Sequence, residues 1–354
     1  MSTTAIGSGV RRQPAIVVRG LRRSFGQIDA LGGPEGGPGL SFEVPRGIVM
    51  GLLGPDGAGK TTLIRILCTV LGADVGDAEV FGRSVRSEAA QVTPRIGYMS
   101  QQFSMYPDLS IAENVDYFAT LRGVPRRVRR ERAEQLLTGM GLAEFADRRA
   151  GALSGGMKQK LMLTTTLMHS PELLLLDEPT TGVDPVSRRE FWRILGELNA
   201  AGTTVLVATP YMDEADRCHE IAFLDNGLIT ASGTPEAIKQ SVAHELVEIA
   251  HPDRRAALAA VASVPGVDSP HLLGDLVRVF YIDDPRRRER EQPLVQALAA
   301  AGLADAEVRH VPMDMEAAYT ALAAAGPPHD EQHEQQHRRQ HEHERPRASH
   351  EVST

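Results

Sequence analysis

The feature that most constrains this chain is a glycine-rich loop, G-P-D-G-A-G-K-T, which runs from Gly54 to Thr61. It follows an apolar, strand-like run at Ile48–Leu53 and opens a segment, Thr61–Leu71, with the pattern of a helix. Glycines let backbone N–H groups turn inward around phosphate oxygens, and the N-terminus of the following helix adds its positive dipole end. The loop therefore predicts a nucleoside triphosphate site, with ATP as the expected ligand.

The residue types in this loop predict separate roles. The ammonium group of Lys60 is expected to contact the β- and γ-phosphates, and the hydroxyl of Thr61 is expected to ligate Mg²⁺. The predicted ATP-binding residues of the loop are Gly54, Pro55, Asp56, Gly57, Ala58, Gly59, Lys60, Thr61 and Thr62. ATP and Mg²⁺ are thus the expected cofactors.

A second segment, L-L-L-L-D-E-P at residues 173–179, predicts a buried strand that ends in two acidic residues. Asp177 would then lie at the carboxyl edge of the sheet, beside the phosphate loop. We expect Asp177 to hold Mg²⁺ and Glu178 to polarise the attacking water. A strand end capped by acidic residues is the simpler alternative, and the phosphate loop upstream disfavours it.

A third segment, L-S-G-G-M-K-Q-K-L at residues 153–161, places Ser154, Gly155 and Gly156 before a helix. Free N–H groups at a helix N-terminus predict a second phosphate site. Taken alone, Ser154 would be an ordinary helix N-cap.

Strand-like and helix-like segments alternate through the first two thirds of the chain, which predicts an α/β fold with a largely parallel sheet. After Gly233 the pattern changes to a small α+β unit with the rhythm of a split βαβ motif. The expected organisation is a flexible leader at 1–14, an ATP-binding domain at 15–240 with a helical subdomain at about 102–160, an accessory domain at 241–326, and a disordered tail at 327–354.

Composition excludes several classes of protein. The formal net charge is −8, so bulk attraction to nucleic acid is not expected. The two cysteines fit a reducing compartment better than a disulfide framework. Because residues 1–9 lack an apolar core, no signal peptide is predicted, and no apolar run reaches the roughly 20 residues of a membrane helix. Any work at a membrane would need a partner.

Two low-complexity segments lie outside this pattern. The run Leu31–Gly39 contains five Gly and two Pro, which predicts a surface loop. The tail at 327–354 is rich in His, Gln, Glu and Arg, so its composition favours a solvated, disordered segment. Four histidines recur at every fourth residue of this tail and would share one face of a helix that could bind a divalent metal, at His329, His333, His337 and His341.

Together the three motif segments closely resemble the ATP-binding subunits of ABC transporters, over about residues 15–235. The wording G-L-L-G-P-D-G-A-G-K-T-T, L-S-G-G-M-K-Q-K and D-E-P-T-T-G-V-D-P is similar to multidrug-efflux members, which pair with a separate membrane permease. The C-terminal α+β segment resembles the small accessory domain that many such exporters carry. The resemblance implies a P-loop NTPase of ABC type with a ferredoxin-like accessory domain, peripheral at the cytoplasmic face of the membrane.

The same resemblance implies an ATPase that drives export of a drug or lipid-like substrate through the permease. It also implies a second ATP-binding subunit, identical or different, so that Ser154, Gly155 and Gly156 clamp the γ-phosphate of ATP held by the opposite subunit. Asp184, in T-G-V-D-P, matches the loop that communicates across that dimer.

Two further positions match family roles. Phe25 matches the aromatic residue that stacks on adenine, and a core phenylalanine is the alternative. Gln101 matches the catalytic glutamine that senses the γ-phosphate, contacts Mg²⁺ and couples to the permease, although Gln102 beside it leaves the register open by one. The arginine-rich stretch Arg122–Arg132 is either a solvated helix face or a contact with anionic lipid headgroups or permease loops.

One position departs from the family pattern. Pro210 follows the strand T-V-L-V-A-T, where the family has a histidine that contacts the γ-phosphate. Proline has no N–H and no side-chain donor. We therefore expect slower ATP hydrolysis than in relatives, or another donor. A soluble ABC-type ATPase acting on ribosomes or DNA and a weakly catalytic nucleotide-binding regulator stay open as alternatives.

Overall fold

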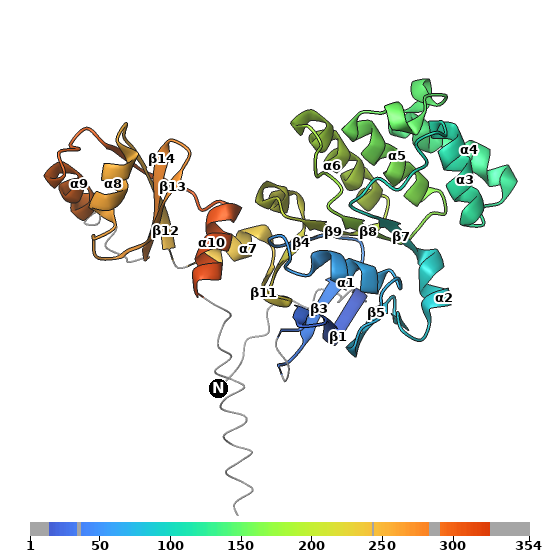
Figure 1. Cartoon of the computed structure of the whole chain (residues 1–354), viewed down its shortest axis with the longest axis horizontal. Coiled ribbons are helices and arrows are strands. Elements are labelled where there is room, and N and C mark those ends of the chain that lie inside the picture. Colours follow the sequence, from blue (N-terminus) through green and yellow to red (C-terminus); the bar gives the residue numbers. More distant parts are fainter. Residues whose placement is uncertain (1–13, 34–36, 243, 283–290, 326–354) are drawn as a thin grey trace, which may run out of the picture.

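The computed structural model describes residues 14–33, 37–242, 244–282 and 291–325. Three β-sheets organise these residues: a six-stranded sheet, a five-stranded sheet beside it, and a four-stranded sheet formed by the C-terminal part of the chain (Figure 1). Helices cover or separate the sheets, which confirms the predicted α/β class.

The six-stranded sheet has the order β11-β10-β4-β9-β8-β7. Its strands are β4 (Val49–Leu53), β7 (Ile96–Met99), β8 (Leu173–Asp177), β9 (Thr204–Thr209), β10 (Glu220–Asp225) and β11 (Leu228–Gly233). All run parallel except β11, which pairs antiparallel with β10. Every residue of β4, β8 and β9 is buried, as their continuous apolar sequences require.

The five-stranded sheet is antiparallel and lies beside the phosphate loop. Its strands are β1 (Pro14–Phe25), β2 (Ile28–Leu31), β3 (Leu40–Pro45), β5 (Val75–Val80) and β6 (Arg83–Ser84). Helix α1 (Lys60–Leu67) packs between the two sheets, because its buried residue Leu63 shares one apolar core with Ile16 of β1 and Leu52 of β4. Short helices α2 (Ala89–Val92) and η1 (Thr93–Arg95) lead into β7.

Helices cover the other face of the six-stranded sheet (Figure 1). They are α3 (Ile111–Leu121), α4 (Arg126–Gly139), η2 (Ala143–Phe145), η3 (Ala150–Ala152), α5 (Gly155–Leu167) and α6 (Pro185–Ala200). Helix α3 begins with a capping box, in which Ser110 and Glu113 satisfy each other's backbone N–H groups. Leu161 of α5 and Phe191 of α6 share one core with Leu174 of β8. These helices correspond to the predicted helical subdomain and its neighbours.

The C-terminal sheet has the order β13-β14-β12-β15 and is antiparallel throughout. Its elements are β12 (His244–Ala250), α8 (Arg254–Val261), β13 (Val267–Leu273), β14 (Leu276–Ile282), α9 (Glu291–Ala300) and β15 (Glu307–Val311). The strand between β12 and β13 in space is β14, which is the split βαβ arrangement expected from the sequence.

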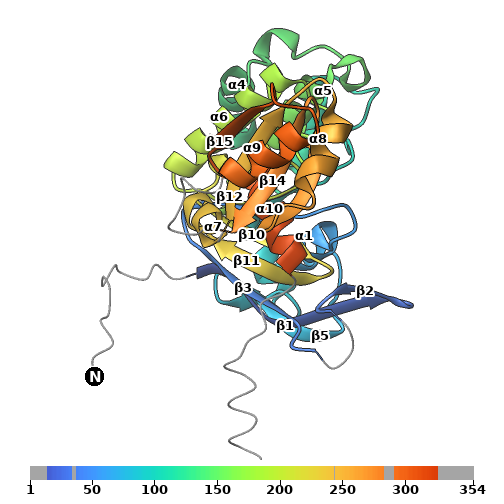
Figure 2. The same ribbon diagram turned by 90° about the vertical axis from the view of Figure 1, so that its left-hand side faces the viewer.

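The last described helix, α10 (Met315–Ala325), returns to the ATP-binding part of the chain. It packs against η4 (Met212–Arg217) and α7 (Pro235–Ser241), as Figures 1 and 2 show. The ring of Tyr319 lies 5.1 Å from that of Phe223 in β10. On its other side, Ala317 packs with Leu246 and Phe280 of the C-terminal sheet, so this helix contacts both parts of the chain.

Three sequence predictions fall wholly or partly outside the described residues. The surface loop expected at Leu31–Gly39 is wrong at its start, because Leu31 ends strand β2 and is buried with Gly32 and Gly33. The N-H of Gly32 donates to the carbonyl of Gly227. The leader before Pro14 and the histidine-rich tail lie outside the described residues. Within the described part of the chain, no helix is long and apolar enough to cross a membrane.

Candidate functional site

A cavity of about 580 Å³ opens at the carboxyl edge of the six-stranded sheet. Its lining comes from β2, the phosphate loop and the segments after β7, β8 and β9, and consists of Ile28, Ala30, Asp56, Gly57, Gly59, Lys60, Thr61, Thr62, Gln101, Glu178, Thr181, Pro210 and Tyr211. The carboxyl ends of parallel strands share one edge, so segments far apart in sequence meet there. The volume falls within the range of small-molecule sites.

At Gly59, the phosphate loop adopts a backbone conformation that only glycine accommodates without strain. Gly59 is the N-cap of α1, with φ of +106°. A Cβ atom at Gly59 would lie 2.4 Å from the carbonyl oxygen of Ala30 in β2. The loop is therefore packed directly against the neighbouring sheet. Of the loop residues predicted to bind ATP, Gly54, Pro55 and Ala58 do not line the cavity and the others do.

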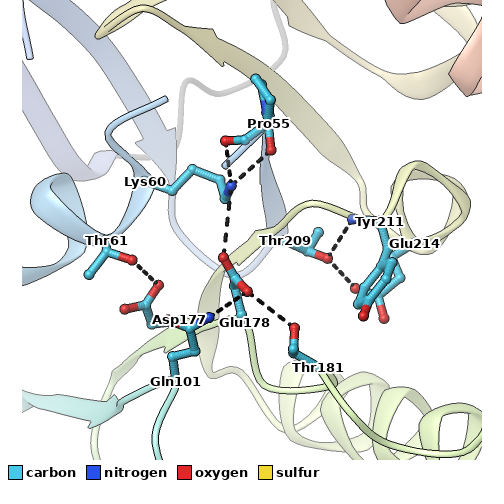
Figure 3. Close-up of polar contacts among 11 residues, drawn as sticks. Pro55, Lys60, Thr61, Gln101, Asp177, Glu178, Thr181, Thr209, Tyr211 and Glu214 are labelled. Atoms are coloured by element: carbon cyan, nitrogen blue, oxygen red, sulfur yellow. Dashed lines mark hydrogen bonds and ion pairs between the residues drawn. The ribbon is translucent and has the colours of Figure 1, made fainter. Parts of the chain in front are cut away.

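The side chain of Lys60 is 4% exposed and curls back over its own loop (Figure 3). Its Nζ donates to the carbonyl oxygens of Gly54, at 2.8 Å, and Pro55, at 2.9 Å. It also lies 3.9 Å from Oε1 of Glu178. Burial lowers the pKa of Lys60, and the Glu178 carboxyl opposes that shift. A buried ammonium group held this way is suited to meet an anion.

Thr61 lines the cavity and contacts Asp177, which is buried behind it. The Thr61 hydroxyl donates to Oδ1 of Asp177 at 2.9 Å. Burial raises the pKa of Asp177 above its usual range, and the bond from Thr61 opposes the shift. Two oxygen donors at this separation fit a hard divalent cation such as Mg²⁺.

Glu178 is held in an unusual backbone conformation next to these groups. Its φ is +49°, in the left-handed region that residues other than glycine rarely adopt. Its Oε2 accepts from Nε2 of Gln101 at 2.9 Å and from Oγ1 of Thr181 at 3.2 Å. Gln101 lines the cavity and Gln102 does not, so the geometry favours the predicted register.

The segment after β9 forms one wall of the cavity. Pro210 lines it at the position where the sequence lacks a histidine. The next amide, of Tyr211, donates to Oγ1 of Thr209 at 3.1 Å, and the Tyr211 ring lies 4.2 Å from the guanidinium carbon of Arg188. The backbone amide that follows Pro210 is therefore already engaged and is not free to replace the missing histidine.

Phe25 does not line the cavity, although it was predicted to stack on adenine. Its ring is 44% exposed and lies 4.8 Å from the guanidinium carbon of Arg23. Its cross-strand partner Ile28 and the nearby Ala30 line the cavity instead. Sequence reasoning missed Ile28 and Ala30, because only the pairing of β1 with β2 brings them there. It also missed Thr181 and Tyr211. Thr181 lies three residues after Glu178 and Tyr211 directly follows Pro210, so their positions in the sequence could have indicated them.

The remaining predicted residues gather on a different surface, away from the cavity lining. Ser154 caps α5, and its Oγ accepts from the amide of Met157 at 3.4 Å. Asp184 caps α6 and accepts from the amides of Val186 and Ser187, both at 3.0 Å. The hydrogen bond from the Ser187 amide lowers the pKa of Asp184.

The two helix N-termini touch each other. A Cβ atom at Gly156 would lie 2.6 Å from Oγ of Ser187, and one at Gly155 would lie 3.3 Å from the carbonyl oxygen of Gly182. The signature segment and the Asp184 loop thus form one packed unit. The chain holds this unit apart from its own phosphate loop.

Comparison with known proteins gives a consistent set of similarities. A family model described as ABC transporter matches residues 38–181. The chain is 40% identical over 267 residues to the probable multidrug ABC transporter ATP-binding protein YbhF of Escherichia coli (strain K12), covering 75% of this chain and 46% of that protein. The chain therefore spans about half the length of this relative.

A second relative matches nearly end to end. The daunorubicin/doxorubicin resistance ATP-binding protein DrrA of Streptomyces peucetius is 37% identical over 312 residues, which covers 87% of this chain and 93% of that protein. A solved structure titled as the ATP binding subunit of an ABC transporter superposes with a TM-score of 0.57 at 25% identity, covering 64% of this chain and 92% of that one.

Proposed function

This chain belongs to the ATP-binding subunits of ABC transporters, and from that premise we propose that it binds and hydrolyses ATP to drive export through a separate membrane permease. The observation that supports this most strongly is that Lys60, Thr61 and Glu178 line one cavity, with Asp177 hydrogen-bonded to Thr61 behind it. A buried cation, a cation-binding carboxyl and a second carboxyl for water are the groups that phosphoryl transfer needs.

The triphosphate of ATP would lie against the phosphate loop, at the N-terminus of α1. Lys60 would exchange its two carbonyl contacts for phosphate oxygens, which gives its buried charge a stronger partner. Magnesium would neutralise charge on the β- and γ-phosphates, and we assign Thr61, Asp177 and Gln101 to hold it. The site excludes most water around Glu178, which is 7% exposed.

Glu178 is the residue we assign to the attacking water. Its Oε2 is held by Gln101 and Thr181, so the carboxylate has a fixed orientation toward the cavity. An oriented carboxylate accepts a proton from water as the oxygen attacks the γ-phosphorus. Gln101 would orient the same water and report the presence of the γ-phosphate.

The separation of Ser154, Gly155 and Gly156 from the cavity supports a composite site. ATP-binding subunits of this family dimerise and pair with membrane permeases. In the dimer that we propose, the N-terminus of α5 from one subunit contacts the γ-phosphate held by the other. Asp184 then lies beside that contact, because its helix packs against α5.

The names of the two relatives support a drug as the exported substrate. They are named for multidrug transport and for daunorubicin/doxorubicin resistance. We propose that the chain acts at the cytoplasmic face of the membrane. Substrate choice would reside in the permease.

The proposal is tested by comparing ATP binding with ATP hydrolysis in the full chain. We expect Glu178→Gln to bind a fluorescent ATP analogue as tightly as the wild type while phosphate release falls by at least about a hundredfold. The matched control is Glu172→Gln, at the opposite end of β8, where the carboxylate pairs with Arg95 at the surface. Hydrolysis by Glu178→Gln at the wild-type rate would contradict the proposal.

Pro210 favours one alternative, a nucleotide-binding regulator with little turnover. The same assay separates the two functions, because a regulator would bind ATP and release no phosphate in either the wild type or the Pro210→His variant.

A further inference from the structure

Glu214, in η4, is a fully buried carboxyl that lies outside the cavity. It is 0% exposed, and each of its oxygens accepts one hydroxyl hydrogen bond. Oε1 accepts from Thr180 at 2.7 Å, and Oε2 accepts from Thr209 at 2.7 Å. A buried carboxyl is costly unless its contacts compensate it, so its placement calls for a role.

The first of these bonds fixes the loop that carries Glu178. Thr180 is two residues beyond Glu178, and the hydroxyl of Thr181 donates to the Glu178 carboxylate. The amide of Glu178 donates to the carbonyl of Ala208 in β9 at 2.9 Å. The loop is thus tied to the β9 side of the site at two points. A left-handed backbone at a residue such as Glu178 is strained and persists only where its surroundings hold it.

The second bond fixes the cavity wall. Thr209 is the last residue of β9, and its hydroxyl oxygen also accepts from the Tyr211 amide on the far side of Pro210. Figure 3 shows Thr209, Tyr211 and Glu214 together on this side of the site. Arg188 completes the group, because it stacks on the Tyr211 ring and its Nε lies 3.9 Å from Glu214.

We propose that Glu214 is a positioning residue, which holds Glu178 and the Pro210–Tyr211 wall in fixed geometry through Thr180 and Thr209. This inference rests on the proposed ATPase activity. Glu214 contacts neither the phosphate loop nor Lys60, so its influence falls on the chemical step and not on nucleotide affinity. Misplacing a reacting group by about 1 Å costs up to about a hundredfold in rate.

Glu214→Gln in the full chain tests this most simply. The glutamine keeps the shape but replaces one acceptor with an NH₂ group, so one threonine hydroxyl loses its acceptor. We expect kcat for ATP to fall at least about tenfold, while KM and the affinity for a fluorescent ATP analogue stay within about threefold. The matched control is Glu248→Gln, which removes the partner of Arg278 in the accessory sheet and leaves kcat unchanged.

Thr180→Val provides a second, isosteric variant in case the glutamine variant does not fold. It removes the hydroxyl that donates to Oε1 of Glu214 and lowers kcat in the same way. The double variant loses less than the sum of the two single losses, because both changes act on the same pair of side chains. Additive losses would overturn the pairing.

A kcat for Glu214→Gln within twofold of the wild type would overturn the proposal, as would equal losses in kcat and affinity. Amide hydrogen exchange provides a readout that needs no turnover: exchange in segment 178–183 is faster in Glu214→Gln than in the wild type and Glu248→Gln. If the wild type does not hydrolyse ATP, the proposed function alone is contradicted. If amide hydrogen exchange in segment 178–183 is the same in Glu214→Gln as in the wild type, the positioning role alone is contradicted.

Discussion

The absence of a histidine at Pro210 leads to a quantitative prediction: Pro210→His raises the rate of ATP hydrolysis. Pro210 lines the cavity near Lys60 and Glu178, so an imidazole there can reach a γ-phosphate oxygen. The adjacent amide of Tyr211 is already engaged by Thr209, and the Tyr211 ring is held by Arg188. The backbone of the wild-type segment therefore offers the phosphate no free amide in place of the imidazole.

The expected rate increase follows from the free energy by which one such hydrogen bond stabilises the transition state. A donor aimed at developing charge contributes about 2–4 kcal/mol in a closed active site. The cavity of one subunit is open on the side of Ile28, which is 69% exposed, so solvent weakens the contact. We therefore take a value below that range, about 1.4–2 kcal/mol, which corresponds to an increase of about 10- to 30-fold in kcat.

The assay is steady-state phosphate release at saturating Mg·ATP, with Pro210→Ala as the matched control. Both variants lose the restraint that proline places on the unfolded chain, which costs about 0.4–1 kcal/mol of stability. Only the histidine adds a donor, so only the histidine variant gains turnover. An equal or lower rate in Pro210→His than in Pro210→Ala would refute the reasoning.

Three further predictions concern the loop, a thiol and the C-terminal helix. Gly59→Ala abolishes binding of a fluorescent ATP analogue, because its Cβ would lie 2.4 Å from the Ala30 carbonyl; retained binding would contradict this packing. Burial raises the pKa of the Cys218 thiol to about 12, so this thiol resists thiol reagents at pH 8 until the chain unfolds; rapid labelling of the folded protein would contradict this resistance. The stability that the protonated thiol contributes is lost as pH rises from 9 toward 12. Tyr319→Ala loosens α10 from Phe223 and lowers the free energy of unfolding by about 1–3 kcal/mol in urea titrations, and an unchanged midpoint would argue against that contact.

The sequence was most informative where one physical requirement dominates. Continuous apolar runs at Val49–Leu53 and Leu173–Leu176 are typical of buried strands, and the residues that follow each run would then share one edge of a parallel sheet. The meeting of Lys60, Thr61 and Asp177 was therefore predictable from linear sequence alone.

Contacts that depend on tertiary pairing were not predictable. Ile28 reaches the cavity only because β2 folds back on β1. From the sequence, the aromatic ring of Phe25 is the more evident candidate for a contact with adenine. The apolar pattern of residues 315–325 indicates a helix with one buried face, but periodicity does not say which surface covers that face. The buried role of Glu214 was equally hidden, since its partners Thr180 and Thr209 lie in other segments.

The central claim is that this chain forms half of an ATP site that a second subunit completes. Static light scattering of the full-length Glu178→Gln variant tests it directly, because this variant is expected to hold ATP without hydrolysing it. The account predicts monomers without nucleotide, dimers with Mg·ATP, and monomers again when Lys60→Ala is added to remove ATP binding. Monomers at saturating Mg·ATP, with binding confirmed in the same sample, would contradict it.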